Sequence, residues 1–593
     1  MAIITLQVSL WMELLYPAMT ILLITTHLKD ARSLTHLVLN LIGATVGCAA
    51  AIALAALFIQ QPWFYLSVMF VMVTALVYFM VSSRYRGSYF CCAYLFIVAC
   101  FMIIFDKEHA EQQTLMVFRS GAIGVIISGL AHVFLWPRSP ATLLREQLAH
   151  LLSRPIESLS GLATSTNERR DAPAPAAEVN PFRISECIET LERAETDAQF
   201  QRGDRPSVMA LIGAVNGLAN AVDSAARALA GSRVDPERTL RTIEAASRTI
   251  RALRDALNDP GRAGAFAMAV RDAVAELNAR EIDPRVQPLA DAVRAVGEAR
   301  AALDGLVILD SRPDTASVLI GNLRGCLAGV CRERFVPLND RLFAHAAKCA
   351  LAVMICLLFC VTLNWSHGIG CVETIMLVVQ ATLGGTVVIG LLRLFGVVVA
   401  VFVAVGVVIF IMPTITTLPG LLLVFGPLLL LVGYGMGASE RATTPAVQVM
   451  IVVDFALLQV PRPSIDLFPV MNFSLAVALG VVVSFIVYHF IWRVRAAAVI
   501  PSVIAAMESE VERTRELAAR EPLTPSRFWQ ALARTDAQHA QLVRLHEDAR
   551  IDSPGTPLEE SARLDAISAA HASASSALIG LMPRVSRVAS GDG

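Results

Sequence analysis

Long apolar runs alternate with short polar stretches in two parts of the chain, and a polar region follows each part. A membrane-spanning helix needs about 20 mostly apolar residues. The first part has runs near this length at 2–25, 34–59, 62–82, 88–105 and 114–136. The second part has runs at 343–363, 370–385, 388–412, 418–437, 444–460 and 471–492. The pattern predicts an all-α polytopic membrane protein with two transmembrane halves.

The polar regions carry a helical period. Apolar residues recur at three- and four-residue steps at Val208, Leu211, Val215, Leu218 and Val222, which is typical of an amphipathic helix. Asp235-Pro236-Glu237 indicates the start of another helix, because proline and acidic side chains favour a first helical turn. We therefore expect four domains: a first transmembrane half at 1–137, a helical domain at 138–342, a second transmembrane half at 343–493 and a helical domain at 494–593.

The two transmembrane halves resemble each other. Trp11 precedes Thr20-Ile21-Leu22-Leu23, and Trp365 precedes Thr374-Ile375-Met376-Leu377, a shift of 354 residues. Gly43 and Gly396 follow at nearly equal distances. Internal repeats are common in transporters. Because a polar helical region follows both halves, we expect a parallel repeat. Gly43 and Gly47 form a GxxxG pattern, which predicts close helix packing.

The repeat leaves the run at 343–363 without a complete partner, since that partner would end near Ser9. Two interpretations stay open: residues 1–9 are the stub of a first helix, or the halves have five and six spans. Basic residues fall in alternate loops, with Arg462 as the exception on the outer side, and the positive-inside rule then places the polar regions in the cytoplasm. These residues are Lys29, Arg32, Arg84, Arg86, Arg138, Arg145, Arg393, Arg441, Arg493 and Arg495.

Composition narrows the class of protein. The chain is 55% hydrophobic and 17% charged, whereas soluble proteins have about a quarter charged residues. Its net charge of −1 argues against nucleic-acid binding. Phosphate-loop, nucleophile-elbow and zinc-protease motifs are absent from the sequence, so we expect neither an enzyme nor a cofactor. Most cysteines lie in apolar runs and should pack as small hydrophobes, while Cys326 and Cys331 lack a second ligand pair for zinc.

Asp454 is the sharpest candidate for transport chemistry. It lies in an apolar run midway between Pro445 and Pro461. A carboxylate inside a membrane is costly unless it is paired, hydrated or protonated. We expect Asp454 to be a proton relay or a residue of the substrate pathway; the alternative is a structural hydrogen bond to a neighbouring helix.

Other ionisable residues lie near the ends of predicted spans. Arg119 begins the last span of the first half, and Arg393 lies near one end of a second-half span. Each either attracts an anionic substrate or snorkels to lipid headgroups. Glu13 and Glu373 lie near the starts of equivalent short spans, where they either face a water-filled cavity or sit at the membrane surface.

Polar residues also end these short spans. His27 ends the first, and Gln380 and Thr382 occupy the comparable stretch of the second. Polar groups in a short span are typical of a broken helix that lines a transport pathway.

Three sequence features resemble those of the fusaric acid resistance family, which includes the aromatic acid exporters and p-hydroxybenzoic acid efflux pump subunits. They are the short span with Tyr-Pro-Ala-Met-Thr at 16–20, the glycine-rich span at 41–47, and a last span from Arg119 to Trp136-Pro137. With the repeated architecture, the resemblance covers nearly the whole chain. Two departures are the missing first helix and Thr26-His27-Leu28-Lys29 in place of a Pro- and Gly-containing loop.

The resemblance implies proton-driven export of aromatic carboxylic acids or related toxic organic compounds across a bacterial inner membrane. It also implies a periplasmic membrane-fusion protein and an outer-membrane channel as partners, and a homo-oligomer is compatible with it. Two alternatives stay open: a passive organic-anion channel, and a membrane-anchored scaffold or envelope protein.

Overall fold

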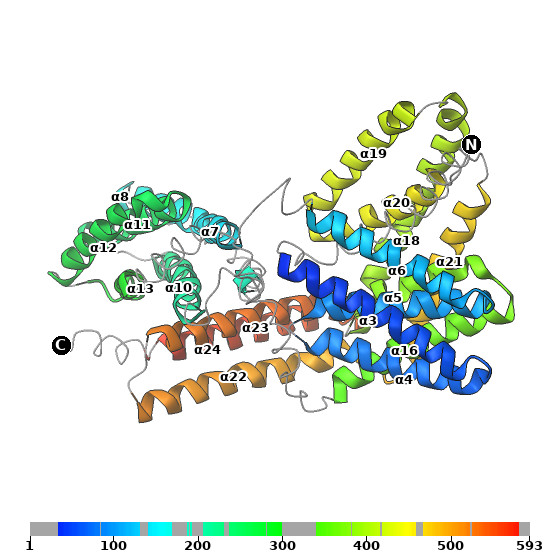
Figure 1. Ribbon diagram of the computed structural model, residues 1–593. Coiled ribbons are helices and arrows are strands. Elements are labelled where there is room, and N and C mark those ends of the chain that lie inside the picture. Colours follow the sequence, from blue (N-terminus) through cyan, green and yellow to red (C-terminus); the bar gives the residue numbers. More distant parts are fainter. Residues whose placement is uncertain are drawn as a thin grey trace. The chain divides into compact units, whose positions relative to one another are not determined.

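The computed structural model describes residues 34–83, 85–130, 140–168, 187–188, 190–191, 205–229, 236–279, 282–298, 340–380, 382–415, 418–457, 467–521, 525–579 and 581. Within these ranges the regular elements are helices, with no strand among them (Figure 1). Six described helices are long and apolar enough to cross a membrane: Leu37–Phe58, Pro62–Ser82, Arg86–Phe105, Asp340–Thr362, Leu383–Thr414 and Phe468–Phe490. The predicted all-α polytopic membrane fold is therefore confirmed.

The chain divides into two compact units. The first, here called the membrane unit, comprises residues 1–137, 320–496 and 548–554. The second, here called the polar unit, comprises residues 138–319, 497–547 and 555–593. The polar segments that flank the second transmembrane half in sequence thus belong to one unit.

The helices of the two halves make corresponding contacts. In the first half, α3 (Leu34–Phe58) packs on α5 (Arg86–Phe105) and α6 (Ala110–Leu130). In the second half, α18 (Leu383–Gly406) packs in the same way on α20 (Glu440–Leu457) and α21 (Phe468–Phe490). The remaining helices of the unit are α4 (Pro62–Ser82), α16 (Asp340–Thr362), α17 (Ile369–Val378) and α19 (Leu418–Ala438). This matching packing agrees with the repeat read from the sequence.

Glycines permit these contacts. A Cβ atom on Gly43 would lie 2.3 Å from the Ser88 carbonyl oxygen, and one on Gly47 would lie 2.3 Å from that of Cys92. In the second half, a Cβ atom on Gly396 of α18 would lie 2.7 Å from the Pro445 carbonyl oxygen. The expectation that the GxxxG pattern serves close packing is confirmed, because the helix backbones touch at these positions.

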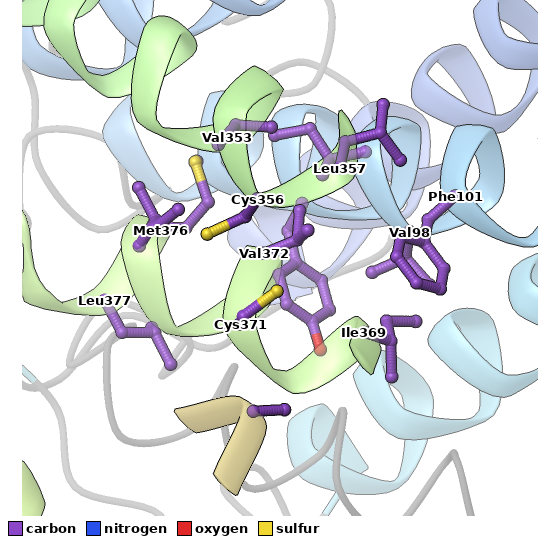
Figure 2. Close-up of a cluster of buried hydrophobic side chains, with 14 of the residues drawn as sticks. Val98, Phe101, Val353, Cys356, Leu357, Ile369, Cys371, Val372, Met376 and Leu377 are labelled. Carbon is purple, nitrogen blue, oxygen red and sulfur yellow. The ribbon is translucent and has the colours of Figure 1, made fainter. Parts of the chain in front are cut away.

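The two halves share one hydrophobic core. α16 packs on α4, and α17 packs on α5. Figure 2 shows Val98 and Phe101 of α5 beside Ile369 of α17, with Cys356 of α16 close to Val372. The described cysteines are free and buried, as expected of thiols that pack as hydrophobes. Cys326 and Cys331 lie outside the described residues.

The polar unit consists of amphipathic helices. Val208, Leu211, Val215, Leu218 and Val222 are all buried, as their spacing predicts. The helix start predicted at 235–237 is confirmed by α11, which begins at Pro236. The helices are α7 (Pro140–Leu151), α8 (Ser153–Glu168), α10 (Arg205–Leu229), α11 (Pro236–Asn258), α12 (Ala263–Asn278), α13 (Gln287–Glu298), α22 (Ala496–Arg520), α23 (Pro525–Asp552) and α24 (Pro557–Ile579). The last residues of α23, from Asp548 onward, belong to the membrane unit.

The glycine contacts give a stability prediction. Gly47→Ala should lower the free energy of unfolding by about 1–3 kcal/mol, because the new methyl group meets a backbone carbonyl that has little room to move. Gly406→Ala is the matched control: its Cβ would meet nothing within 4 Å, and alanine favours a helix. Thermal unfolding of the detergent-solubilised protein measures both. Equal melting temperatures for the two variants would contradict the proposed close contact.

Candidate functional site

Three buried polar side chains from both halves lie near one another inside the membrane unit. They are Tyr94 of α5, Glu373 of α17 and Arg393 of α18, with exposed fractions of 5%, 7% and 3%. The Tyr94 hydroxyl donates a hydrogen bond of 3.0 Å to the Glu373 carboxylate. The Arg393 guanidinium lies within electrostatic range of both residues, without a direct ion pair to Glu373 in the described part of the chain. We refer to these residues as the Tyr94–Glu373–Arg393 cluster.

Two members of the cluster, Arg393 and Tyr94, lie far from the ends of their helices. Arg393 is ten residues after Leu383, which begins α18, or about 15 Å along the axis at 1.5 Å per residue. Tyr94 is eight residues after Arg86, which begins α5, or about 12 Å. Because the hydrocarbon core is about 30 Å thick, these positions lie near the middle of the spans. Substrate sites of secondary transporters are typically found at this depth.

Several buried polar atoms on or beside the helices of the cluster have no hydrogen-bond partner within the described part of the chain. They include the Arg393 Nε, the Thr374 hydroxyl and both amide atoms of Gln448. Thr374 and Gln448 are fully buried, and Gln448 lies on α20 where Gly396 of α18 packs against it. Buried polar groups are normally hydrogen-bonded, so unpaired ones call for an explanation such as a water, an ion or a ligand.

Two sequence-predicted residues, Glu373 and Arg393, thus lie within electrostatic range of each other. The snorkelling interpretation is wrong for Arg393, because its side chain is buried. α18 begins at Leu383 rather than 388, which moves Arg393 away from the helix end. A signal was present in the sequence: Arg393 lies three residues from both Gly390 and Gly396, and these close-packing glycines mark the buried face.

Gln380 and Thr382 lie where α17 gives way to α18, and they do not join the cluster. Thr382 is the N-cap of α18 and accepts a hydrogen bond from the Gly385 amide at 3.2 Å. Its hydroxyl donates to the carboxylate of Asp548, at the end of α23, at 2.7 Å. The backbone N–H of Gln380 donates a hydrogen bond to the Thr386 hydroxyl at 3.0 Å. The short helix ends in a tightly hydrogen-bonded break.

Among the other candidates, only the side chain of Arg119 is described. Arg119 is exposed on α6. Asp454 belongs to α20, but its side chain lies outside the described residues, as do Glu13 and His27. The roles expected for these residues remain predictions.

Sequence reasoning missed Tyr94 and a polar group where α21 ends. Lys348 is only 1% exposed and donates to the Trp492 carbonyl at 2.8 Å, with its ammonium 4.9 Å from the centre of the Tyr488 ring. Trp492 has a φ of 40°, a left-handed conformation that is uncommon outside glycine. Tyr488 in turn lies 3.0 Å from the His345 imidazole. Tyr94 and Lys348 are polar residues within long apolar runs, and nothing in their spacing indicates that they have buried partners.

The Thr382 contacts can be tested by substitution. Thr382→Val should lower the free energy of unfolding by about 1–2 kcal/mol, because it removes the helix cap and the donor to Asp548. Thr382→Ser keeps the hydroxyl and should stay close to wild type. Thermal unfolding in detergent compares the variants, and equal losses for both would mean that the hydroxyl contributes nothing.

Comparison with known proteins identifies the family of this chain. It matches the Fusaric acid resistance protein family over residues 2–570. It is 25% identical over 192 residues to the multidrug resistance protein MdtO of Escherichia coli K12, and equally to that of Shigella flexneri. The matched stretch covers 32% of this chain and only 28% of those relatives. No solved structure matches the chain. The family match spans nearly the whole sequence, and the chain therefore belongs to the Fusaric acid resistance protein family.

Proposed function

We propose that this protein exports organic anions, with aromatic carboxylic acids as the substrate class, and that the proton gradient drives the export. The observation that carries this proposal is the buried guanidinium of Arg393 near the middle of α18. A cation in that position is costly unless it is compensated. Its Nε has no partner among the described residues, and a carboxylate is the group that a guanidinium binds best.

Glu373 supplies the coupling to protons. In the absence of substrate, the Glu373 carboxylate accepts the Tyr94 hydrogen bond, which joins α5 and α17, and its negative charge attracts Arg393 of α18. A substrate carboxylate that occupies Arg393 loosens this arrangement, and so does a proton that neutralises Glu373. Either ligand then releases the helices for the change of access. The protein that carries neither substrate nor proton does not change access. Each cycle therefore exports an anion in one step and takes up a proton in the other.

The direction of transport agrees with the energetics. An inside-negative membrane potential favours outward movement of one negative charge by about 2.3 kcal/mol per 100 mV. Each proton that enters in exchange adds to this driving force. The relatives named above are multidrug resistance proteins, which supports efflux.

The proposal also covers the membrane, the orientation and the partners of the protein. The protein lies in a bacterial inner membrane, with the helices of its polar unit in the cytoplasm, as the loop charges indicate. A periplasmic membrane-fusion protein and an outer-membrane channel complete the export path, and assembly into a homo-oligomer is part of the proposal. Family resemblance supports these partners.

Transport assays test the proposal. Cells or proteoliposomes loaded with p-hydroxybenzoate or fusaric acid should export it, and an uncoupler should reduce that export at least tenfold. Arg393→Gln should abolish export, because the carboxylate loses its cation. Glu373→Gln should keep exchange of labelled for unlabelled substrate but lose the response to a pH gradient. Arg119→Gln, on the exposed face of α6, should behave as wild type.

Variant abundance in the membrane must be equal for the comparison to hold. Rapid export by Glu373→Gln that still follows the pH gradient would overturn the coupling role. Flux through the wild type that ignores the pH gradient and the uncoupler would favour the passive anion channel instead. No flux of either compound, with Arg393→Gln indistinguishable from wild type, would leave the scaffold as the better account.

A further inference from the structure

The polar unit holds a second buried cluster of ionisable side chains. Asp536 and His539 lie on α23, and His571 and Ser575 lie on α24; Asp536, His539 and Ser575 are at most 7% exposed. The Asp536 carboxylate lies 2.7 Å from the His571 Nε2. The rings of His539 and His571 stack face to face, with centroids 4.0 Å apart and planes within 5°.

This cluster also joins segments that are distant in sequence. The side-chain amide of Asn216, on α10, donates to the other oxygen of the Asp536 carboxylate. Asn216 is itself 2% exposed. α10 precedes the second transmembrane half in the chain, whereas α23 and α24 follow it. Asp536 therefore connects the two polar segments of the unit through buried hydrogen bonds.

The arrangement does not suit hydrolysis, although serine, histidine and aspartate are all present. The Ser575 hydroxyl lies 3.2 Å from His571 Nε2, the same nitrogen that faces Asp536. In a catalytic triad the serine and the carboxylate lie on opposite nitrogens of the ring, so that the imidazole can take the serine proton. The cluster thus has the geometry of a structural junction.

We propose that the Asp536–His539–His571 cluster is an acid-sensitive junction, which holds α10 against α23 and α24 and loosens as the pH falls. Two imidazole rings in face-to-face contact at 4.0 Å cannot both carry a positive charge without strong repulsion. With His571 beside the Asp536 carboxylate, His539 has to stay neutral for the stack to persist. Protonation of His539 therefore requires the packed arrangement to open.

The charges around the cluster agree with this proposal. Burial, and then the charge of His571, lower the pKa of His539 from 6.5 to about 3. Above about pH 6.5, His539 is neutral in both the packed and the opened forms, and the junction keeps its full stability. Below that pH, only the opened form takes up the proton, so stability falls as the pH falls.

Asp536 acts in the opposite direction. Burial raises the pKa of its carboxyl, and the His571 hydrogen bond and charge only partly offset this. The packed form therefore binds this proton more readily than the opened form does, which favours packing in acid. The next charged group on α23, Arg534, is engaged by Glu510 of α22 at 2.8 Å, and α10 contributes the neutral Asn216. Removing Asp536 should therefore steepen the acid response rather than abolish it.

Hydrogen–deuterium exchange of the full-length protein in nanodiscs tests this inference. Exchange rates of α10, α23 and α24 amides, corrected for intrinsic chemistry, should rise by up to tenfold for each pH unit below about 6.5. His539→Phe keeps a flat ring without a titrating group and should flatten this rise. Asp536→Asn should exchange with a steeper pH dependence than wild type. His150→Gln, an exposed histidine on α7, is the control and should follow wild type.

Two results would overturn the proposal. One is constant corrected exchange in the wild type between pH 7.5 and pH 5.5 (on the order of one pH unit either side of 6.5). The other is a His539→Phe variant that is protected at neutral pH yet opens in acid as the wild type does. If phenylalanine already abolishes protection at neutral pH, His539→Gln replaces it, and the same two comparisons decide. The readout does not depend on transport, so the proposed function can fail without affecting this test.

Discussion

A buried guanidinium in an apolar helix bundle constrains the rest of this structure. Placing Arg393 near the middle of α18 requires a compensating group in reach, because an isolated charge in the hydrocarbon region is costly. Glu373 provides the opposite charge, and Tyr94 holds the Glu373 carboxylate. Since Tyr94 comes from the first half and Glu373 from the second, this hydrogen bond also joins the two halves.

The internal repeat explains how such a site can arise. When the two halves are aligned on Gly43 and Gly396, Asn40 of α3 corresponds to Arg393 of α18. Both side chains are buried. In the first half, Asn40 accepts a hydrogen bond from Ser88 of α5 at 3.3 Å. The same position in the fold thus holds a neutral amide in one half and a cation in the other. The repeat supplies the packing, and the difference between halves supplies the charge.

The sequence predicted the fold well, because long apolar runs and helical periodicity depend on local residues alone. It also singled out Glu373 and Arg393, since ionisable residues stand out in apolar runs. It placed Arg393 near a helix end because hydropathy did not show that α18 begins at Leu383. Tyr94 and Asp548 could not be found, because their importance comes from partners 279 and 166 residues away in the chain.

The central claim is that Arg393 binds the carboxylate of an organic anion inside the membrane unit. Isothermal titration of the purified protein with p-hydroxybenzoate measures this directly, without assuming any coupling mechanism. The account predicts saturable binding by the wild type and by Arg119→Gln, and at least tenfold weaker binding by a folded Arg393→Gln variant. Equal affinity in the wild type and in Arg393→Gln would contradict the account and place the anion site elsewhere.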